Sequence, residues 1–139
     1  MPGDTSHPIQ QACAVPYRRR GDRLEFCLIT SIRKGIWQFP KGIIDPGETP
    51  TETALKEAEE EAGLHGHVFD EPLGGYEYAK WGTTLAVTAF LMEVEAADDH
   101  WEEAGLRRRC WCGAEGARRI LSRDDLRRLL DAALARLGP

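Results

Sequence analysis

The residues of this chain best suited to chemistry are three glutamates at positions i, i+3 and i+4, namely Glu57, Glu60 and Glu61. On a helix this spacing gathers the carboxylates on one flank, where each like-charge pair costs about 0.2–0.5 kcal/mol. Lys56 is the only cation in residues 49–63 and cannot neutralise them. Carboxylate oxygens suit Mg²⁺ and Mn²⁺, which bind one or two carboxylates together with substrate phosphates. The cluster therefore predicts a divalent metal site, and the competing interpretation is a solvated acidic face.

The segment that carries these acids has explicit helix start and stop signals. Thr49 is a suitable N-cap, Pro50 fits the first helical position, and Glu52 completes a Thr-x-x-Glu capping box. Gly63 follows the last turn, where a left-handed backbone is usual. Small and apolar residues at helical spacing form a stripe that we expect to pack on a sheet: Ala54, Leu55, Ala58 and Ala62.

The whole stretch from Gly42 to Leu64 resembles the Nudix box, whose pattern is G-x5-E-x7-R-E-U-x-E-E-x-G-U with U an apolar residue. Every fixed position matches except one, where Lys56 stands for the family arginine. Residues 37–41 (Trp-Gln-Phe-Pro-Lys) resemble the lead-in of Nudix members that act on diphosphoinositol polyphosphates and dinucleoside polyphosphates. Residues 14–19 and 28–31 resemble the same members, so that the resemblance covers most of the chain.

The resemblance implies hydrolysis of a pyrophosphate bond in a nucleoside-diphosphate-linked or related polyphosphate, with diphosphoinositol or diadenosine polyphosphates as the leading substrate classes. It implies Mg²⁺ (or Mn²⁺) as the cofactor. The implied metal ligands are Gly42, through its carbonyl, and Glu57, Glu60 and Glu61. One of these acids, or a metal-held water that it orients, acts as the base, and the choice among the three stays open.

A brace between Glu48 and the box cation is also implied. Lysine at position 56 offers a single ammonium where arginine offers a bidentate fork, so we expect looser geometry and lower turnover. The predicted catalytic set is Glu48, Lys56, Glu57, Glu60 and Glu61.

Cations outside the box are candidates for the substrate phosphates. The predicted substrate-binding residues are Arg18, Arg20, Ser31, Arg33, Lys41 and Lys80, with Arg107 as a weaker candidate. Four aromatic residues could stack on a base or pack in the core: Trp37, Tyr76, Tyr78 and Trp81.

Composition limits the class of protein. With 139 residues, 42% of them hydrophobic, the chain fits one globular domain, which we place at residues 9–139 after a flexible tail at residues 1–8. It lacks a long apolar run and a signal peptide, which predicts a cytoplasmic protein without a membrane partner. Acids dominate residues 40–72 and arginines dominate residues 107–139, a segregation that suits a small polyphosphate better than a nucleic-acid polymer. A monomer or a homodimer is expected.

The cysteines and histidines are interpreted as structural. Cys13 and Cys27 fall in apolar, strand-like runs, where cysteine behaves as a small hydrophobe. Cys110 and Cys112 are too close for C-x2-C zinc spacing and point the same way on a strand, so a zinc or redox role is disfavoured.

The pattern of elements predicts an α/β fold. Strands are expected at residues 11–17, 24–31, 37–39, 67–69, 73–78, 83–94 and 107–111, with loops at residues 42–47 and 95–105. A short helix is expected at residues 114–121, followed by a final helix capped by Ser122 with Asp125 three residues on. Two substantial helices and these strands give the α/β/α sandwich with a mixed central sheet that the resemblance implies.

Three alternatives stay open beside the leading function. They are nucleotide-pool cleaning, ADP-sugar hydrolysis and a ligand-sensing Nudix domain without catalysis. An isomerase on the same scaffold is disfavoured, since no histidines and cysteine are arranged for that chemistry.

Overall fold

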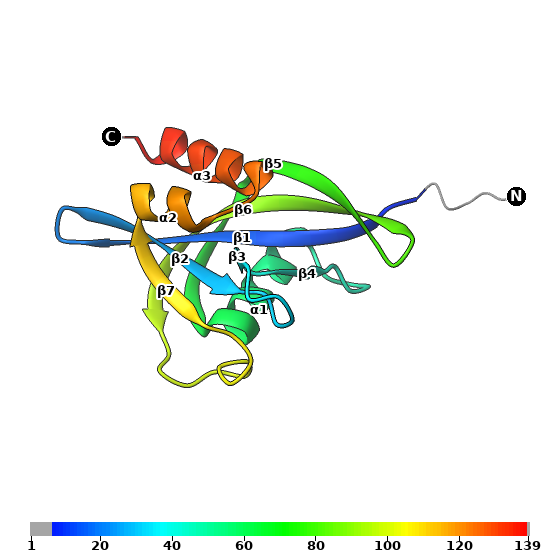
Figure 1. Ribbon diagram of the computed structural model, residues 1–139, viewed down its shortest axis with the longest axis horizontal. Coiled ribbons are helices and arrows are strands. Elements are labelled where there is room, and N and C mark those ends of the chain that lie inside the picture. Colours follow the sequence, from blue (N-terminus) through cyan, green and yellow to red (C-terminus); the bar gives the residue numbers. More distant parts are fainter. Residues whose placement is uncertain (1–6, 139) are drawn as a thin grey trace, which may run out of the picture.

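The computed structural model describes residues 7–138, so most of the expected tail at residues 1–8 lies outside the described part. Seven strands and three helices follow one another along the chain (Figure 1). Their bounds are β1 (Ile9–Arg20), β2 (Arg23–Thr30), β3 (Trp37–Gln38), β4 (Lys41–Ile43), α1 (Pro50–Ala62), β5 (Leu64–Lys80), β6 (Thr83–Ala97), β7 (Arg109–Gly113), α2 (Ala114–Ile120) and α3 (Asp124–Leu137). Between residues 7 and 138 no helix is long and apolar enough to span a membrane.

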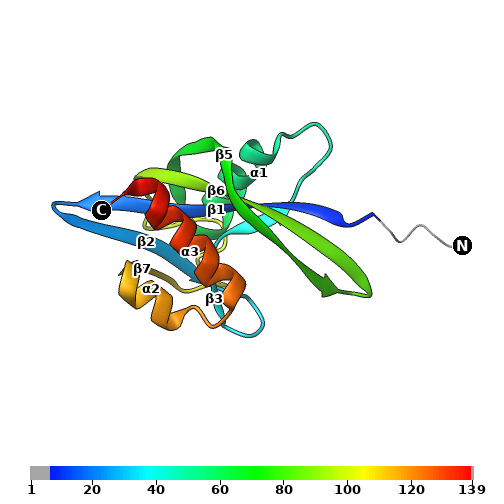
Figure 2. The same cartoon turned by 90° about the horizontal axis from the view of Figure 1, so that it is seen from above.

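The strands form one mixed sheet in the order β3-β2-β1-β6-β5. β1 and β6 run parallel, and the other pairs of strands are antiparallel. On its other edge β1 pairs first with β4 and then with β2, while β7 pairs with β2. Helix α1 packs on one face of the sheet, and α2 and α3 pack on the other (Figures 1 and 2). The predicted α/β/α sandwich with a mixed sheet is confirmed.

The core consists of two apolar layers that β1 separates. Residues 11–17 are all buried, as expected for a strand covered on both faces. Ala12 and Ala14 point toward α1, whereas Cys13 and Val15 point toward α3, because successive side chains of a strand alternate. On the α1 side the helix contributes the fully buried alanines of the predicted stripe, Ala54, Ala58 and Ala62. Such small side chains let the helix lie close to the sheet, which places its acidic flank beside β4.

Several predicted boundaries of strands are wrong. The two short strands expected at 67–69 and 73–78 are one long strand, β5, whose ladder with β6 shifts register around Pro72. Bulges of this kind absorb a residue that cannot donate to the ladder. The loop expected at 42–47 begins as β4, since the free edge of β1 offers it hydrogen-bond partners. β6 continues to Ala97, so the predicted loop at 95–105 starts later.

The expected cap of the last helix is also wrong. The N-cap of α3 is Arg123, without a side-chain cap hydrogen bond, and the helix begins at Asp124 instead of directly after Ser122. The Asp125 carboxylate pairs with the Arg123 guanidinium at 2.6 Å, so it does not reach back to Ser122 as a capping box requires. Helix α3 packs on the sheet through an apolar stripe, with Leu126, Leu129, Leu130 and Ala133 buried.

Candidate metal and polyphosphate site

Helix α1 begins with the predicted capping box. The Thr49 hydroxyl accepts the Glu52 backbone N–H at 3.2 Å, and the Glu52 carboxylate accepts the Thr49 N–H at 2.8 Å. The helix ends at Ala62, and Gly63 follows it with the left-handed backbone that the sequence predicted, at a φ of 68°. The Gly63 N–H donates to the Glu59 carbonyl. Both ends of the acidic helix are therefore set by residues within or next to it.

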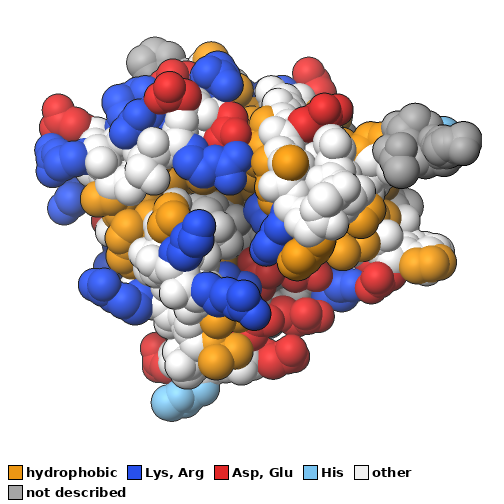
Figure 3. Space-filling model, turned by 45° about the vertical axis from the view of Figure 1, so that its right-hand side comes forward, with side chains coloured by type: hydrophobic (Ala, Val, Ile, Leu, Met, Phe, Trp, Pro, Cys, Tyr) orange, Lys and Arg blue, Asp and Glu red, His pale blue; other side chains and the backbone are white. Residues whose placement is uncertain are grey.

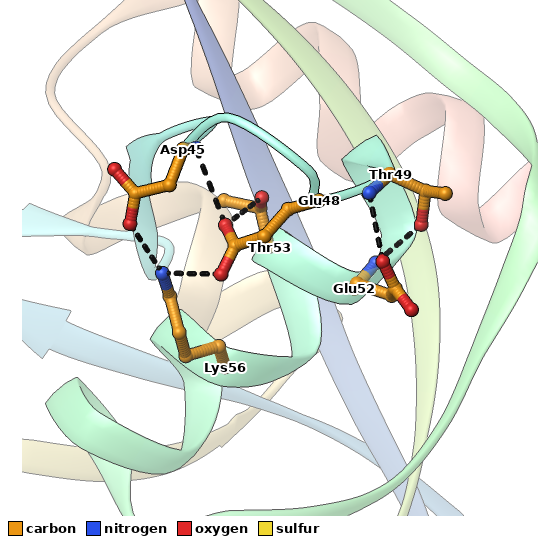
Figure 4. Close-up of polar contacts among 6 residues, drawn as sticks. All are labelled: Asp45, Glu48, Thr49, Glu52, Thr53 and Lys56. Atoms are coloured by element: carbon orange, nitrogen blue, oxygen red, sulfur yellow. Dashed lines mark hydrogen bonds and ion pairs between the residues drawn. The ribbon is translucent and has the colours of Figure 1, made fainter.

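The loop before α1 is tied to the helix by the predicted brace (Figure 4). The Lys56 ammonium donates to the Glu48 carboxylate at 2.7 Å and to the Asp45 carboxylate at 2.9 Å. Thr53 donates to the other Glu48 oxygen at 2.7 Å. The hydrogen bond from Lys56 lowers the pKa of Glu48, and the pKa of Lys56 is raised in turn. Lysine thus makes the contact expected of the family arginine and recruits Asp45 as well.

Strand β4 brings Gly42 against the acidic flank. A Cβ atom on Gly42 would lie 2.3 Å from the Glu57 carboxyl carbon, so only glycine leaves room for that carboxylate. The Lys41 backbone N–H donates to the Glu61 carboxylate at 3.1 Å. The predicted ligands Gly42, Glu57 and Glu61 are therefore adjacent, and Glu60 lies on the same flank of the helix.

The electrostatics of this flank are unfavourable for bare carboxylates. Burial is the main cause that raises the pKa of Glu57 and of Glu61; Arg107 lowers the pKa of Glu61, and the neighbouring Glu57 raises it. Burial and then the nearby Glu102 raise the pKa of Glu60. Neighbouring carboxylates that are shielded from water disfavour joint ionisation, so a proton or a cation stabilises them.

The donor set fits Mg²⁺ or Mn²⁺. The acids offer hard oxygen ligands whose mutual repulsion a divalent ion would relieve. Within residues 7–138 no group of three or more His, Cys, Asp or Glu side chains is arranged to hold a metal ion. Mg²⁺ can nevertheless bind through one or two carboxylates, because water and substrate phosphates supply its other ligands.

Residues 98–109, of which the sequence had associated only Arg107 with the site, hold the end of α1. They supply donors to three successive carbonyls of the last turn: Glu103 N–H to Glu60, Trp101 Nε1 to Glu61 and Arg109 Nη1 to Ala62. Carbonyls at a helix end need hydrogen-bond donors, but no local sequence pattern says which segment provides them.

His65 lies next to this turn and contacts Asp98 at 2.6 Å and Glu59 at 3.4 Å. The hydrogen bond to Asp98 is the main cause of the raised pKa of His65.

Arg107, a weaker candidate for the substrate phosphates, lines the cavity beside the acids and also pairs with two of them. Its side chain is 8% exposed, and it contacts Glu103 at 2.6 Å and Glu61 at 3.5 Å. It also donates to the Thr30 carbonyl at 3.0 Å. Arg107 therefore positions Glu61, and Glu103 is a further acid near the cluster that sequence reasoning missed. The acidic composition of the predicted loop was the only signal for it.

A cavity of about 660 Å³ adjoins the acids. Glu61 is its only acidic lining residue, whereas six cations line it: Arg33, Lys34, Lys41, Lys80, Arg107 and Arg123. Lys41 joins the two regions, because its N–H binds Glu61 while its ammonium donates to the Tyr78 hydroxyl at 3.0 Å. On the face shown in Figure 3, acidic side chains (red) lie directly beside basic ones (blue). Such a juxtaposition suits a polyphosphate bridged to a cation.

The structure brings four of the six predicted substrate residues to this cavity, namely Ser31, Arg33, Lys41 and Lys80. The Ser31 hydroxyl accepts the Ile36 N–H at 3.0 Å and so shapes the loop that forms one wall. Arg18 and Arg20 do not reach the cavity, because β1 carries them to the tip of the β1–β2 hairpin (Figure 1). Arg18 instead pairs with Glu25 at 2.9 Å.

The four aromatic candidates separate into different environments. Trp37 and Tyr78 line the cavity, and Tyr76 packs at the edge of the core. Trp81 is 73% exposed at the turn between β5 and β6. Only the first two are therefore placed to contact a molecule in the cavity.

The α/β/α sandwich, with an acidic loop–helix beside a basic cavity, is the architecture of a Nudix domain. The family model described as NUDIX domain matches residues 8–133, and the chain belongs to this family. The resemblance inferred from residues 42–64 is confirmed.

Relatives share this domain at low identity. Nudix hydrolase 4 of Arabidopsis thaliana is 31% identical over 128 residues, which cover 85% of this chain and 61% of the relative. The asymmetrical bis(5'-nucleosyl)-tetraphosphatase of Caenorhabditis elegans is 28% identical over 130 residues, covering 88% of this chain and 91% of the relative. The crystal structure of C. elegans Ap4A hydrolase superposes with a TM-score of 0.79 at 25% identity, covering 95% of this chain and 100% of that one. The chain spans only 61% and 64% of the length of two plant relatives, Nudix hydrolases 4 and 21.

Proposed function

We propose that the chain is a divalent-metal-dependent pyrophosphohydrolase whose substrate is a dinucleoside polyphosphate or a diphosphoinositol polyphosphate. The observation that carries the proposal is the junction at Lys41, where the buried Glu61 of the acidic flank of α1 meets a cavity lined by cations. Similarity to the C. elegans tetraphosphatase over 91% of its length supports the dinucleoside class. The excess of cations in the cavity supports a highly charged substrate of either class.

Each group of residues has a role in this proposal. Bound Mg²⁺ or Mn²⁺ would neutralise phosphate oxygens and acidify the attacking water. Glu57, Glu60, Glu61 and the Gly42 carbonyl would hold the ions, and one of the three glutamates, or a water that it orients, would act as the base. Lys56 and Glu48 keep the loop before α1 in place. The substrate phosphates are bound by the cavity residues Ser31, Arg33, Lys41 and Lys80.

The test is a panel of dinucleoside polyphosphates, diphosphoinositol polyphosphates, oxidised nucleoside triphosphates and ADP-sugars, assayed with Mg²⁺ or Mn²⁺ by identification of products. We expect turnover that is abolished by EDTA. Glu60→Gln should lower kcat by about 10²–10⁴-fold, and Glu59→Gln, on the exposed side of the same helix, should not. Near-native activity of Glu60→Gln would remove Glu60 from the metal set. No turnover on any substrate would favour the ligand-sensing alternative.

Trp37 distinguishes the two leading substrate classes. A base that stacks on Trp37 gains stabilisation that an inositol ring does not. Trp37→Leu should therefore raise KM about tenfold for a dinucleoside polyphosphate and leave KM for a diphosphoinositol polyphosphate unchanged. Equal effects on both substrates would contradict a base-stacking role.

We also propose that residues 9–139 form one catalytic domain that acts on small molecules as a cytoplasmic monomer or homodimer. The family match to residues 8–133 supports the domain boundaries. Size-exclusion chromatography with light scattering gives the oligomeric state directly. The location needs its own measurement, because one plant relative is named as mitochondrial.

A further inference from the structure

A pair of thiols outside the catalytic region is the feature that the proposed function does not use. Cys110 and Cys112 lie on β7 with their sulfur atoms 3.0 Å apart, and both are free and half-buried. The sequence had disfavoured a zinc or redox role for this pair, but the structure places the two sulfur atoms in contact. Cys13 and Cys27 are fully buried, and burial raises the pKa of each to about 12. Cys110 and Cys112 are thus the solvent-accessible thiols among the described residues.

We propose that Cys110 and Cys112 form a reversible disulfide, with a low-molecular-weight disulfide such as oxidised glutathione as the oxidant. Residues two apart on an extended strand have Cα atoms about 6.6 Å apart. This lies at the upper end of the range of about 4.4–6.8 Å that disulfides span, so ring closure needs only a slight bend of the strand. A bond closed at this limit is strained and easily reduced, as expected of a regulatory disulfide.

The surroundings of the pair permit that bend. Among the described strands β7 pairs only with β2, so it is an edge strand. It ends at Gly113, and α2 turns Gly116 toward Cys112, where an added Cβ would come to 3.5 Å from the Cys112 Cβ. One edge of β7 therefore has no strand partner among the described residues, and Gly116 places no side chain against Cys112.

The chemistry balances with two thiols and one disulfide. Either sulfur can react first, because both thiols are half-buried on the same strand. The thiolate of the first cysteine attacks one sulfur of glutathione disulfide, which leaves a mixed disulfide and releases one glutathione thiolate. The second cysteine then loses its proton and attacks the protein sulfur of the mixed disulfide, which releases the second glutathione. The protein is oxidised by two electrons and glutathione disulfide is reduced to two thiols.

Mass spectrometry of the wild-type chain tests this directly. Trypsin cleaves after Arg109 and Arg118, so both cysteines fall in one peptide, Cys110–Arg118. After treatment with glutathione disulfide and then an alkylating reagent, we expect this peptide to have lost two hydrogen atoms and to carry no alkyl group. Dithiothreitol should restore two alkylatable thiols. A peptide alkylated twice after oxidation, or one in which a glutathionyl adduct persists, overturns the proposal.

Two serine variants give matched controls. Cys110→Ser and Cys112→Ser each keep one thiol and lack the resolving partner, so each should stop at a glutathionyl adduct on the cysteine that remains. Neither variant should lose two hydrogen atoms without an adduct. A single variant that does so would show that another thiol closes the bond.

The disulfide could affect the acidic site, because residues next to the cysteines contact α1. Arg109, the residue before Cys110, donates to the Ala62 carbonyl at the end of α1 at 2.7 Å, and Arg107 holds Glu61. A bend in β7 should loosen these contacts. This effect on activity rests on the proposed function. We expect kcat of the oxidised protein to fall by about twofold or more and to recover after reduction with dithiothreitol. If the disulfide forms and kcat is unchanged, the coupling between the disulfide and the acidic site is refuted, but the disulfide itself is not. If the reduced protein has no turnover, the proposed function is refuted, but the disulfide is not.

Discussion

Replacing Gly42 by alanine tests the geometry of the acidic cluster at its closest contact. The added Cβ would lie 2.3 Å from the Glu57 carboxyl carbon and 2.5 and 2.7 Å from its oxygens, where ordinary contact needs 3.4 Å or more. The Glu57 carboxylate must therefore retreat by about 1 Å, a misplacement that can cost about 10²-fold in rate. Gly42 is not among the residues with a left-handed backbone, so the substitution adds no backbone strain.

The same substitution should leave the fold intact. The atoms in conflict are the far end of a flexible side chain, and alanine stabilises a compatible position by about 0.4–1 kcal/mol through the unfolded chain. We therefore expect Gly42→Ala to lower kcat about 10²-fold without lowering the melting temperature of the metal-free protein. Gly105→Ala is the matched control, because its Cβ would meet nothing within 4 Å and Gly105 also lacks a left-handed backbone.

The assay combines turnover across a Mg²⁺ titration with thermal unfolding in EDTA. Glu57→Asp in the Gly42→Ala background shortens the side chain by one methylene group and should recover part of the lost rate. Wild-type kcat and metal requirement in Gly42→Ala would refute the claim that Glu57 works from this position. An equal loss of rate in Gly105→Ala would show that the effect is not specific to the contact.

Three further predictions concern α1 and its end. Lys56→Arg offers the Glu48 carboxylate a second N–H, so kcat should rise or stay equal, and a lower kcat in steady-state assays contradicts the brace. Glu57→Gln replaces a half-buried carboxylate, whose pKa is raised mainly by burial, with a neutral amide and should raise the free energy of unfolding of the metal-free protein by about 1 kcal/mol above neutral pH. Urea denaturation in EDTA measures this, and an unchanged midpoint would be the contrary result. The raised pKa of His65 means that its ion pairs stabilise the fold fully below the unfolded value of about 6.5 and lose this effect as the pH rises through the folded value. His65→Gln should therefore destabilise by less than about 1 kcal/mol near pH 5.5, given its exposure, and have no effect near pH 8.5; a larger loss at the higher pH would reverse the sign.

The acidic helix was predictable because its signals are local. The capping box at Thr49, the left-handed Gly63 and the brace between Lys56 and Glu48 each depend on residues close in the chain. The β strands were less predictable. β5 looked like two strands because Pro72 interrupts its pattern, and only pairing with β6 makes it continuous. Ser122 failed as a cap because Arg123 competes for Asp125, a choice that side-chain packing makes.

The sequence by itself determined the two ends of α1, the spacing of Glu57, Glu60 and Glu61, and with them the family of the chain. Only the tertiary structure decided what these acids face. The pairing of β4 with β1 brings Lys41 and Gly42 to the acids, and residues 98–109 close over the end of α1. The physical reason is that helix caps and acid spacing arise within a few residues, whereas partners distant in the chain are chosen by strand pairing and by the need of buried carbonyls and carboxylates for donors.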